Sequence, residues 1–465
     1  MMMKFLTVKW KWVLGLAAML AVAVYGSMPA FSSPAIPLRG VVEGFYGTPW
    51  TQAERLSMLQ FCHDHKLNAY IYAPKDDAYH RAKWREMYPA DKMADLQALI
   101  DESKKQQVKF IFAISPGLDI HFSGQEAEQD KQAMLGKLTA MYNMGVRDFA
   151  IFFDDIKNKD GKGQAEFLNW VNANFIAKHK DISPLITVPT EYYRLDMESE
   201  GTIKEYTRNF STTLDKNILV LYTGDKVVPD GLTDEEYAKA NALYGRQLGV
   251  WWNYPVSDYL EAKLALGPVE KLPVKANMPA IFFNPMKHAE LSKISLATGA
   301  DYAANPAKYD ANKSWHKALK EQFGKLTADM EIFADHSQHM VVSWAVIGPE
   351  DGAALRKLMD AYWQNPNDSN REKLLADLSK IDKSILTLQK ELPPKVLKEC
   401  QPQLEQFHRI LQADKLGLEV LAGDQSKQAA FRQAVKEVKA HEPQVLISEK
   451  TARAFMDELQ QHMEK

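Results

Sequence analysis

Cysteine is almost absent from this chain. Only Cys62 and Cys400 occur among 465 residues, so the chain can build neither a disulfide scaffold nor a metal site made of cysteines. The two thiols have the chemistry to pair in an oxidising compartment, but two unpaired, buried thiols are the simpler interpretation. Apolar packing must therefore stabilise the fold, and hydrophobic residues make up 46% of the sequence.

A strong excess of charge is missing as well. The formal net charge is −3, and basic residues are spread along the chain without a long block of one sign. The composition therefore gives no electrostatic reason to expect a nucleic-acid partner. A length of 465 residues exceeds that of a typical single domain and predicts two or three. We find no internal repeat and no low-complexity tract.

Long apolar runs are rare, and the clearest one lies near the N-terminus. Lysines precede the apolar run 13–24, and small residues follow it. This order is typical of a secretory signal peptide, which we assign to residues 1–32 with cleavage near Ser32. The run is short for a membrane span, although an uncleaved anchor is the alternative. We therefore expect a secreted or periplasmic protein that has no membrane partner after cleavage.

A series of short apolar segments follows the signal, with helical or loop stretches between them. The segments that are typical of strands are 39–47, 68–73, 108–114, 148–156, 185–188, 217–222, 248–252 and 280–283. Eight such strands within ~250 residues are typical of a (β/α)8 barrel, which we assign to residues 37–305. A doubly wound open sheet is the alternative, but no glycine-rich phosphate turn follows the first segment.

The C-terminal part of the chain has a helical pattern, and no strand is expected beyond about residue 312. Apolar residues from Leu374 to Leu392 recur alternately four and three residues apart, which gives one apolar stripe along a long helix. Pro393 and Pro394 end that helix. The predicted fold class is therefore α/β, a (β/α)8 TIM barrel followed by an α-helical domain over residues 312–465.

Polar and aromatic residues gather where the predicted strands end. The clearest case is the segment 148–156, in which an apolar run leads directly into two adjacent carboxylates, Asp154 and Asp155. In a barrel of this kind the loops after the strands build the site, so these acids are expected to meet residues from other strand ends. Those further candidates are Gly44, Tyr46, Lys75, Tyr192, Trp251, Asn253, Asp258 and Asn284.

Each candidate has a structural interpretation when it is taken alone. Two adjacent acids are more often a solvated turn, charged loops occur for many reasons, and tryptophans usually fill a core. Their occurrence on successive strand ends favours one shared site. Aromatic rings cover the apolar faces of sugars, and Asp and Asn side chains hydrogen-bond to hydroxyls. The strand ends therefore predict a carbohydrate site.

The motifs at these positions resemble those of glycoside hydrolase family 84. These enzymes are β-N-acetylglucosaminidases and include the O-GlcNAcases and bacterial enzymes labelled hyaluronidases. The similar stretches are 40–50, 72–77 with Arg81 and Trp84, 153–155, 189–192, 251–258 and 284–286. They follow one another over residues 37–300, and the (β/α)8 barrel of the family agrees with the strand pattern. One departure is that no additional β domain is expected before the barrel.

The resemblance implies a retaining exo-β-N-acetylglucosaminidase that works by substrate-assisted catalysis. In this scheme Asp154 orients the 2-acetamido group of the sugar, whose oxygen attacks the anomeric carbon, and Asp155 is the general acid and then the general base. The adjacency of Asp154 and Asp155 favours the same scheme. The two carboxyl groups of an inverting hydrolase stand about 6.5–9.5 Å apart, whereas the Cα atoms of neighbouring residues are only about 3.8 Å apart. The residues implied to contact the sugar or its acetamide are Gly44, Lys75, Tyr192, Trp251, Asn253, Asp258 and Asn284.

No cofactor and no metal is expected. His336 and His339 lie three residues apart on a predicted helix, but the strand ends contain no histidine, and a satisfied or solvent-facing pair is the simpler interpretation. The expected partners are GlcNAc-containing glycans or glycoproteins, while the natural substrate and the oligomeric state are not predicted.

Two other functions compete with hydrolysis. One is a non-catalytic glycan-binding protein on the same barrel, and the other is a partner-binding role for the helical domain. The presence of both Asp154 and Asp155 favours the enzyme, because binding alone does not require an acid together with a carboxylate that orients an acetamide.

Overall fold

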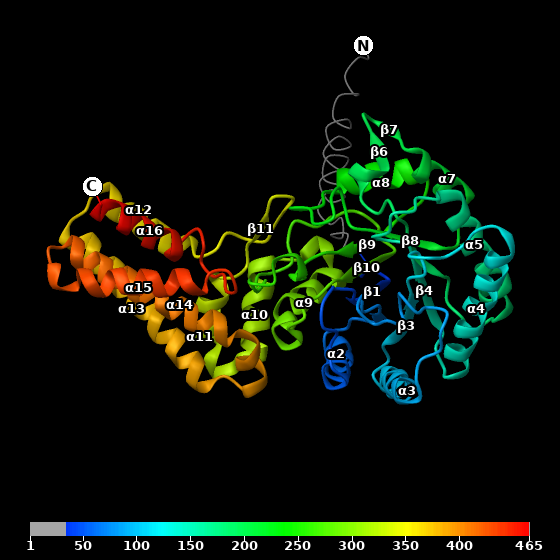
Figure 1. Cartoon of the computed structure of the whole chain (residues 1–465), viewed down its shortest axis with the longest axis horizontal. Helices are drawn as coiled ribbons and strands as arrows, with labels where there is room; N and C mark the ends of the chain where they lie inside the picture. Colours follow the sequence, from blue (N-terminus) through cyan, green and yellow to red (C-terminus); the bar gives the residue numbers. More distant parts are fainter. Residues whose placement is uncertain (1–33, 465) are drawn as a thin grey trace, which may run out of the picture.

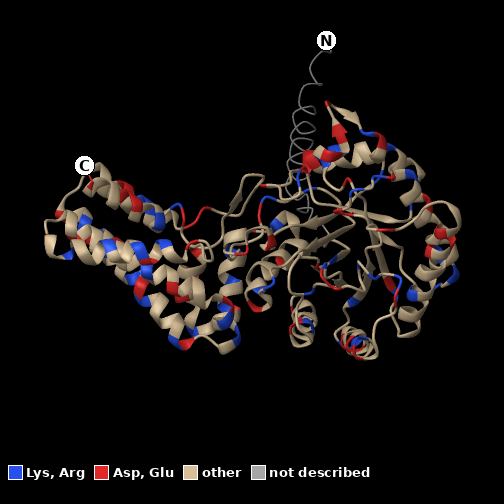
Figure 2. Cartoon of the chain, viewed as in Figure 1, with Lys and Arg blue, Asp and Glu red and all other residues tan. Residues whose placement is uncertain are grey.

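The computed structural model describes residues 34–464 of the chain, so the predicted signal peptide lies outside the described residues. Figure 1 shows a barrel, coloured blue to green, beside a set of helices coloured yellow to red. In the view of Figure 2, basic and acidic residues are interspersed along the helices of both parts, which agrees with the even spread of charge in the sequence. Within residues 34–464, no helix is long and apolar enough to cross a membrane.

Eight parallel strands close the barrel in the order β1-β10-β9-β8-β5-β4-β3-β2. Their bounds are β1 (Leu38–Glu43), β2 (Ala69–Tyr72), β3 (Lys109–Ile114), β4 (Asp148–Phe152), β5 (Ile186–Val188), β8 (Leu219–Tyr222), β9 (Gly249–Trp252) and β10 (Ala280–Phe283). Each strand overlaps the segment predicted for it, and the pairing of β1 with β10 excludes an open sheet. The predicted (β/α)8 barrel is therefore confirmed.

Most residues on both faces of the strands are buried, which is why the strand sequences are mostly apolar rather than alternating. Val42 and Ile71 belong to a cluster inside the barrel, whereas their neighbours Val41 and Tyr70 belong to the larger core shared with the helices. Trp251 belongs to the inner cluster as well, so its indole is a barrel-interior side chain.

The outside of the barrel is covered by helices that follow the strands. These are α2 (Gln52–Asp64), α3 (Ala90–Lys105), α4 (Gly124–Asn143), α5 (Gly161–Asn174), α7 (Glu205–Thr213), α8 (Asp234–Tyr244) and α9 (Ala289–Ala304). Helix α2 begins at a capping box, in which Thr51 accepts from the Glu54 amide and the Glu54 carboxylate accepts from the Thr51 amide.

A small hairpin interrupts the loop after β5. It consists of β6 (Glu198–Ser199) and β7 (Thr202–Ile203), and it follows the short helix α6 (Arg194–Met197). The sequence analysis did not predict this hairpin, because strands of two residues carry no periodicity that a pattern can detect.

The C-terminal part is mostly helical, as predicted. Its helices are α10 (Ala311–Phe323), α11 (Thr327–Asp335), α12 (Ala353–Gln364), α13 (Asp368–Glu391), α14 (Pro394–Leu421), α15 (Gln428–His441) and α16 (Ala452–Met463). The predicted apolar stripe lies on α13, where Leu374, Leu378 and Ile385 are fully buried. Pro394 both follows the end of α13 and begins α14, since the first turn of a helix tolerates proline.

The expectation that no strand occurs beyond residue 312 is wrong. Strands β11 (Met340–Val342) and β12 (Ala345–Ile347) form an antiparallel hairpin between α11 and α12. Each strand has only three residues, too few for an alternating pattern to stand out. The prediction for the cysteines is confirmed, since Cys62 and Cys400 are both buried and unpaired.

Candidate active site

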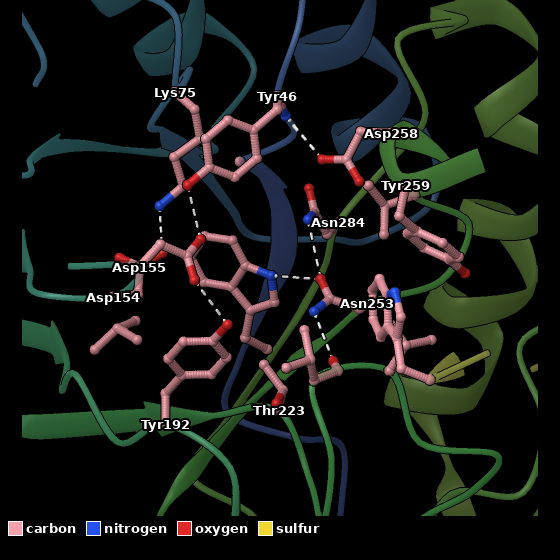
Figure 3. A pocket seen from close by; sticks show the side chains of 17 residues that line it. Tyr46, Lys75, Asp154, Asp155, Tyr192, Thr223, Asn253, Asp258, Tyr259 and Asn284 are labelled. Atoms are coloured by element: carbon pink, nitrogen blue, oxygen red, sulfur yellow. Dashed lines mark hydrogen bonds and ion pairs between the residues drawn. The ribbon is translucent and has the colours of Figure 1, made fainter. Parts of the chain in front are cut away.

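A cavity of about 400 Å³ opens at the carboxyl ends of the barrel strands. The structure brings all ten predicted site residues together in its lining (Figure 3), namely Gly44, Tyr46, Lys75, Asp154, Asp155, Tyr192, Trp251, Asn253, Asp258 and Asn284. The lining residues that the sequence analysis missed are Val188, Thr223, Val227, Val228, Val256, Tyr259 and Trp344. Thr223 directly follows β8, so the strand-end rule extended to that strand finds it, whereas Trp344 comes from the unexpected hairpin.

Asp154 lies in the cavity wall with only one of its two oxygens engaged. The residue follows β4 and is buried. Its Oδ2 forms an ion pair with Nζ of Lys75, whose side chain is also buried. Its Oδ1 is buried and has no hydrogen-bond partner among residues 34–464. Because an unsatisfied buried acceptor costs about 1–3 kcal/mol, this oxygen favours a ligand that brings a donor.

Asp155 is exposed at the cavity and is fixed by three donors. Its Oδ2 accepts from the Tyr46 hydroxyl at 2.8 Å, and its Oδ1 accepts from the Tyr192 hydroxyl at 2.8 Å. Its backbone carbonyl accepts from Nη2 of Arg81 at 3.1 Å. The φ angle of Asp155 is +56°, a left-handed conformation that is uncommon outside glycine and often found at functional sites. The turn after β4 therefore places two neighbouring carboxylates in different environments, Asp154 in the buried wall and Asp155 at the exposed side of the cavity.

The two tyrosines remain protonated donors at neutral pH. Burial, together with the negative charges of Asp155 and Asp154, raises the pKa of the Tyr46 hydroxyl. The same causes, in the same order, raise the pKa of the Tyr192 hydroxyl. Both groups therefore donate to Asp155 throughout the range in which a carboxylate works as an acid or a base.

Trp251 and the two asparagines form a connected floor. The Trp251 Nε1 donates to Oδ1 of Asn253 at 2.9 Å, and Nδ2 of Asn284 donates to the same oxygen at 3.0 Å. Nδ2 of Asn253 donates to the Val227 carbonyl at 2.8 Å, which fixes the orientation of the amide. Oδ1 of Asn284 is buried and has no partner among the described residues, so it is a second acceptor for a donor on a ligand.

Position 44 requires glycine because its backbone lies directly against the Trp251 ring of this floor. A Cβ atom at Gly44 would collide with the six-membered ring of Trp251, so any larger residue displaces the indole. Lys75 Nζ lies 5.8 Å from the centroid of the Trp251 ring, so the cation that pairs with Asp154 also lies near the floor.

Asp258 connects two of the loops that surround the cavity. The residue begins a short 3-10 turn, Asp258–Leu260, in the loop after β9. Its Oδ2 accepts from the Tyr46 backbone amide at 2.8 Å, which ties this loop to the loop after β1. Burial raises the pKa of the Asp258 carboxyl.

The described part of the chain holds no group of three or more His, Cys, Asp or Glu side chains placed to bind a metal ion. His336 Nδ1 shares a hydrogen bond with Ser448 Oγ at 2.9 Å, and His339 Nδ1 shares one with the Gly348 carbonyl at 2.7 Å. Both histidines are buried and satisfied separately. The expectation that both lie on a helix is wrong, because α11 ends at Asp335.

The closed barrel, with paired carboxylates and an aromatic floor at its strand ends, defines a glycoside hydrolase of the (β/α)8 type. A family model described as beta-N-acetylglucosaminidase matches residues 39–335, and one described as hyaluronidase post-catalytic domain-like matches residues 354–456. The chain therefore belongs to the β-N-acetylglucosaminidases of glycoside hydrolase family 84. The resemblance noted from the sequence motifs is confirmed.

Relatives of this chain extend the comparison to whole proteins and solved structures. The protein O-GlcNAcases of Rattus norvegicus and Mus musculus are each 32% identical over 277 residues, 57% of this chain and 30% of theirs. The match thus covers less than a third of these curated relatives. The solved structure of CpGH84B is 38% identical with a TM-score of 0.85, over 92% of this chain and 77% of that one. An O-GlcNAc hydrolase of Thermobaculum terrenum, solved as a mutant, is 29% identical with a TM-score of 0.79, over 91% and 94%.

Proposed function

We propose that this protein is a retaining exo-β-N-acetylglucosaminidase that hydrolyses terminal β-linked GlcNAc by substrate-assisted catalysis. The observation that carries the proposal is the free Oδ1 of Asp154, a buried acceptor beside an oxygen already bound to Lys75. The acetamido N–H of GlcNAc is a donor of the required kind. Once it is bound to Asp154, the acetamido oxygen is turned toward the anomeric carbon.

The first step replaces the leaving group by the acetamido oxygen. A bond forms between that oxygen and the anomeric carbon, while the bond from the anomeric carbon to the leaving oxygen breaks. Asp155 gives its proton to the leaving oxygen, so no alkoxide has to be released. The product is an oxazoline whose N–H and developing positive charge face the Asp154 carboxylate.

The second step reverses the roles. Asp155, now a carboxylate, takes a proton from a water molecule, and the water oxygen bonds to the anomeric carbon as the oxazoline ring opens. The acetamido group is regenerated and the Asp155 proton is restored. Two displacements at the same carbon leave the product in the β configuration of the substrate.

The remaining lining residues suit recognition of a single terminal sugar. The Trp251 ring, which lines the cavity and packs against Gly44, covers the apolar part of the acetamide. Asn253, Asn284 and Asp258 supply amide and carboxylate groups for the sugar hydroxyls. Lys75 holds the negative charge of Asp154 in place through a buried ion pair.

The wild-type protein is expected to release GlcNAc from an aryl β-GlcNAc substrate, with the β anomer appearing first in a proton NMR time course. Appearance of the α anomer first would contradict retention. Binding of an oxazoline mimic without any hydrolysis would instead favour the non-catalytic glycan-binding protein on the same barrel. An aryl-GalNAc substrate, assayed in parallel, reports whether the enzyme discriminates the configuration of the C4 hydroxyl. GlcNAc oligosaccharides report its preference for chain length.

GlcNAc-containing glycans or glycoproteins are the substrate class that this chemistry supports. The rat and mouse relatives carry the name protein O-GlcNAcase, which adds GlcNAc attached to proteins as a specific candidate.

We also propose export from the cytoplasm, supported by the basic, apolar and small-residue order of residues 1–32. N-terminal sequencing of the mature chain is expected to start near Ser32, and a mature chain that begins at Met1 would contradict cleavage.

A further inference from the structure

We propose that Lys137, which lies on α4 and does not line the cavity, is a positioning residue for the two adjacent carboxylates of the site. Its ammonium holds the β2 loop, residues 73–89 between β2 and α3, in the conformation that presents Lys75 and Arg81 to those carboxylates. The inference rests on the proposed function, because it assigns a support to the same reacting groups.

The β2 loop contacts both acidic residues of the site through its two cations. Lys75 Nζ forms the ion pair with Asp154, and Nη2 of Arg81 donates to the Asp155 backbone carbonyl at 3.1 Å. The Arg81 guanidinium also lies 5.5 Å from the centroid of the Tyr46 ring, whose hydroxyl donates to Asp155. A shift of this one loop therefore changes the surroundings of both carboxylates.

Lys137 reaches the middle of the β2 loop from the neighbouring helix. Its side chain is fully buried, and its Nζ donates to the backbone carbonyls of Tyr79 at 2.5 Å, Glu86 at 2.8 Å and Trp84 at 3.0 Å. An ammonium has three N–H donors, so each of them has an acceptor. The acceptors stand on both sides of Arg81 in the sequence, so the ammonium fixes the turn that carries this arginine.

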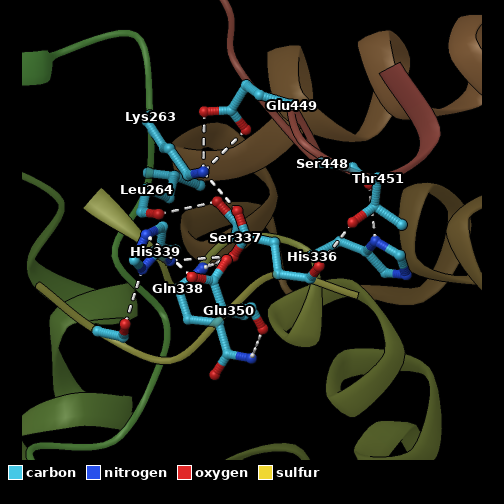
Figure 4. A network of polar contacts seen from close by, with 12 residues as sticks. Lys263, Leu264, His336, Ser337, Gln338, His339, Glu350, Ser448, Glu449 and Thr451 are labelled. Atoms are coloured by element: carbon cyan, nitrogen blue, oxygen red, sulfur yellow. Dashed lines mark hydrogen bonds and ion pairs between the residues drawn. The ribbon is translucent and has the colours of Figure 1, made fainter. Parts of the chain in front are cut away.

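The choice of acceptors separates Lys137 from the other buried lysines. Three lysines are buried among residues 34–464, and two of them, Lys75 and Lys263, pair with carboxylates. Figure 4 shows Lys263, whose partners are Asp351 and Glu449. Lys137 instead gives all three bonds to carbonyls of one loop. An apolar side chain would fill the same space without the cost of burying a charge, so the ammonium serves the conformation of the loop.

The charge on Lys137 is present at neutral pH although burial opposes it. Burial lowers the pKa of the Lys137 ammonium to about 8, so most of the molecules keep the proton at pH 7. The protonated form is the one that satisfies three carbonyls at once, since a neutral amine has only two N–H donors.

Other contacts attach the β2 loop at single points. His80 Nδ1 shares a hydrogen bond with the Ala113 carbonyl at 2.8 Å, which ties the loop to β3. Arg85 pairs with Asp130, another residue of α4, at 2.5 Å. Lys137 differs because it gathers three carbonyls of the loop around one atom, so its loss releases the backbone itself.

Lys137→Met is expected to lower kcat for an aryl β-GlcNAc roughly 10–100-fold and to leave KM within about threefold. A small displacement of groups that act on the transition state costs rate rather than substrate binding. The Kd of an oxazoline mimic, measured by calorimetry, should rise about tenfold or more, because the mimic resembles the charged intermediate. Lys137→Gln retains an N–H donor, should lose less, and is the milder variant if Lys137→Met fails to fold.

Arg81→Met tests the route by which Lys137 acts. The loss of kcat in the double variant should be at least about fivefold smaller than the product of the two separate losses, because both changes release the same contact. A crystal structure of Lys137→Met should show Arg81 displaced from the Asp155 carbonyl.

Two controls separate positioning from stability. Lys131→Met makes the same chemical change on α4, where Lys131 Nζ pairs with Glu128 at 2.6 Å, and it should leave kcat and Kd unchanged. Asp382→Ala, on α13, should lower the melting temperature without a change in kcat or Kd. It removes the acceptor of three α14 side chains, namely His408, Gln412 and Lys415.

An unchanged kcat and Kd in folded Lys137→Met or Lys137→Gln would overturn the proposal. An equal loss of kcat in Asp382→Ala at the same fall in melting temperature would overturn it as well, because the loss would then follow stability. Losses that multiply fully with those of Arg81→Met would overturn the route through Arg81. Failure of the wild type to hydrolyse any GlcNAc substrate would contradict the proposed function, while the Kd of the oxazoline mimic still decides whether Lys137 positions the site.

Discussion

Asp155→Asn is expected to lower kcat/KM by about 10³-fold for GlcNAc on an unactivated alcohol and by about tenfold or less for a dinitrophenyl glycoside. A general acid contributes roughly 10²–10⁴-fold, and only when the leaving oxygen needs a proton. Since kcat/KM reports the first irreversible step, a plot of its logarithm against leaving-group pKa should be shallow in the wild type and steep in the variant. A series of substituted phenyl glycosides measures this slope.

Tyr192→Phe is the matched control for this experiment. It removes one hydroxyl that donates to Asp155 at 2.8 Å but leaves the carboxyl itself. Its slope should stay close to that of the wild type, even if its rate is lower. An equal loss on all leaving groups in Asp155→Asn would remove Asp155 as the general acid.

Asp154→Ala is expected to lower kcat/KM by about 10²–10³-fold on every leaving group, with the slope unchanged. The carboxylate acts on charge that develops on the acetamide, and loss of one preorganised group of this kind typically costs that factor. The effect should therefore be largest in kcat. Parallel assays of the wild type and the variant on the same phenyl glycosides separate this uniform loss from the selective loss in Asp155→Asn.

Stability requires a control, because Asp154→Ala leaves the buried Lys75 ammonium without its carboxylate. Asp154→Asn retains the volume and an oxygen acceptor for Lys75 but not the charge, so it should fold better and still lose most of the activity. A loss of less than about fivefold in both folded variants would contradict the role of Asp154.

The barrel was predictable because its strands are buried on both faces. Segments such as Leu219–Tyr222 and Ala280–Phe283 are apolar or aromatic throughout, and the rule that strand ends build the site then located every proposed contact from Gly44 to Asn284. The family motifs assigned roles to the same positions. The sequence thus predicted which residues gather, although not how they bond to one another.

The bonds within the site were not predictable from patterns, because they join loops that are far apart in the chain. The Tyr46 amide donates to Asp258 across 212 residues, and the Tyr46 hydroxyl donates to Asp155 across 109. Trp344 was missed for a related reason, since its hairpin has two strands of three residues and lies in a part with an otherwise helical pattern. Positions of this kind depend on tertiary packing rather than on local periodicity.

The central claim is that the acetamide of the substrate is the nucleophile. Aryl β-glycosides whose N-acetyl group carries one, two or three fluorine atoms test it directly, because fluorine withdraws electrons from the acetamido oxygen without much change in size. Substrate assistance predicts that kcat/KM of the wild type falls by about tenfold or more with each added fluorine. Equal rates across the series would contradict it and would require a nucleophile supplied by the protein or by water.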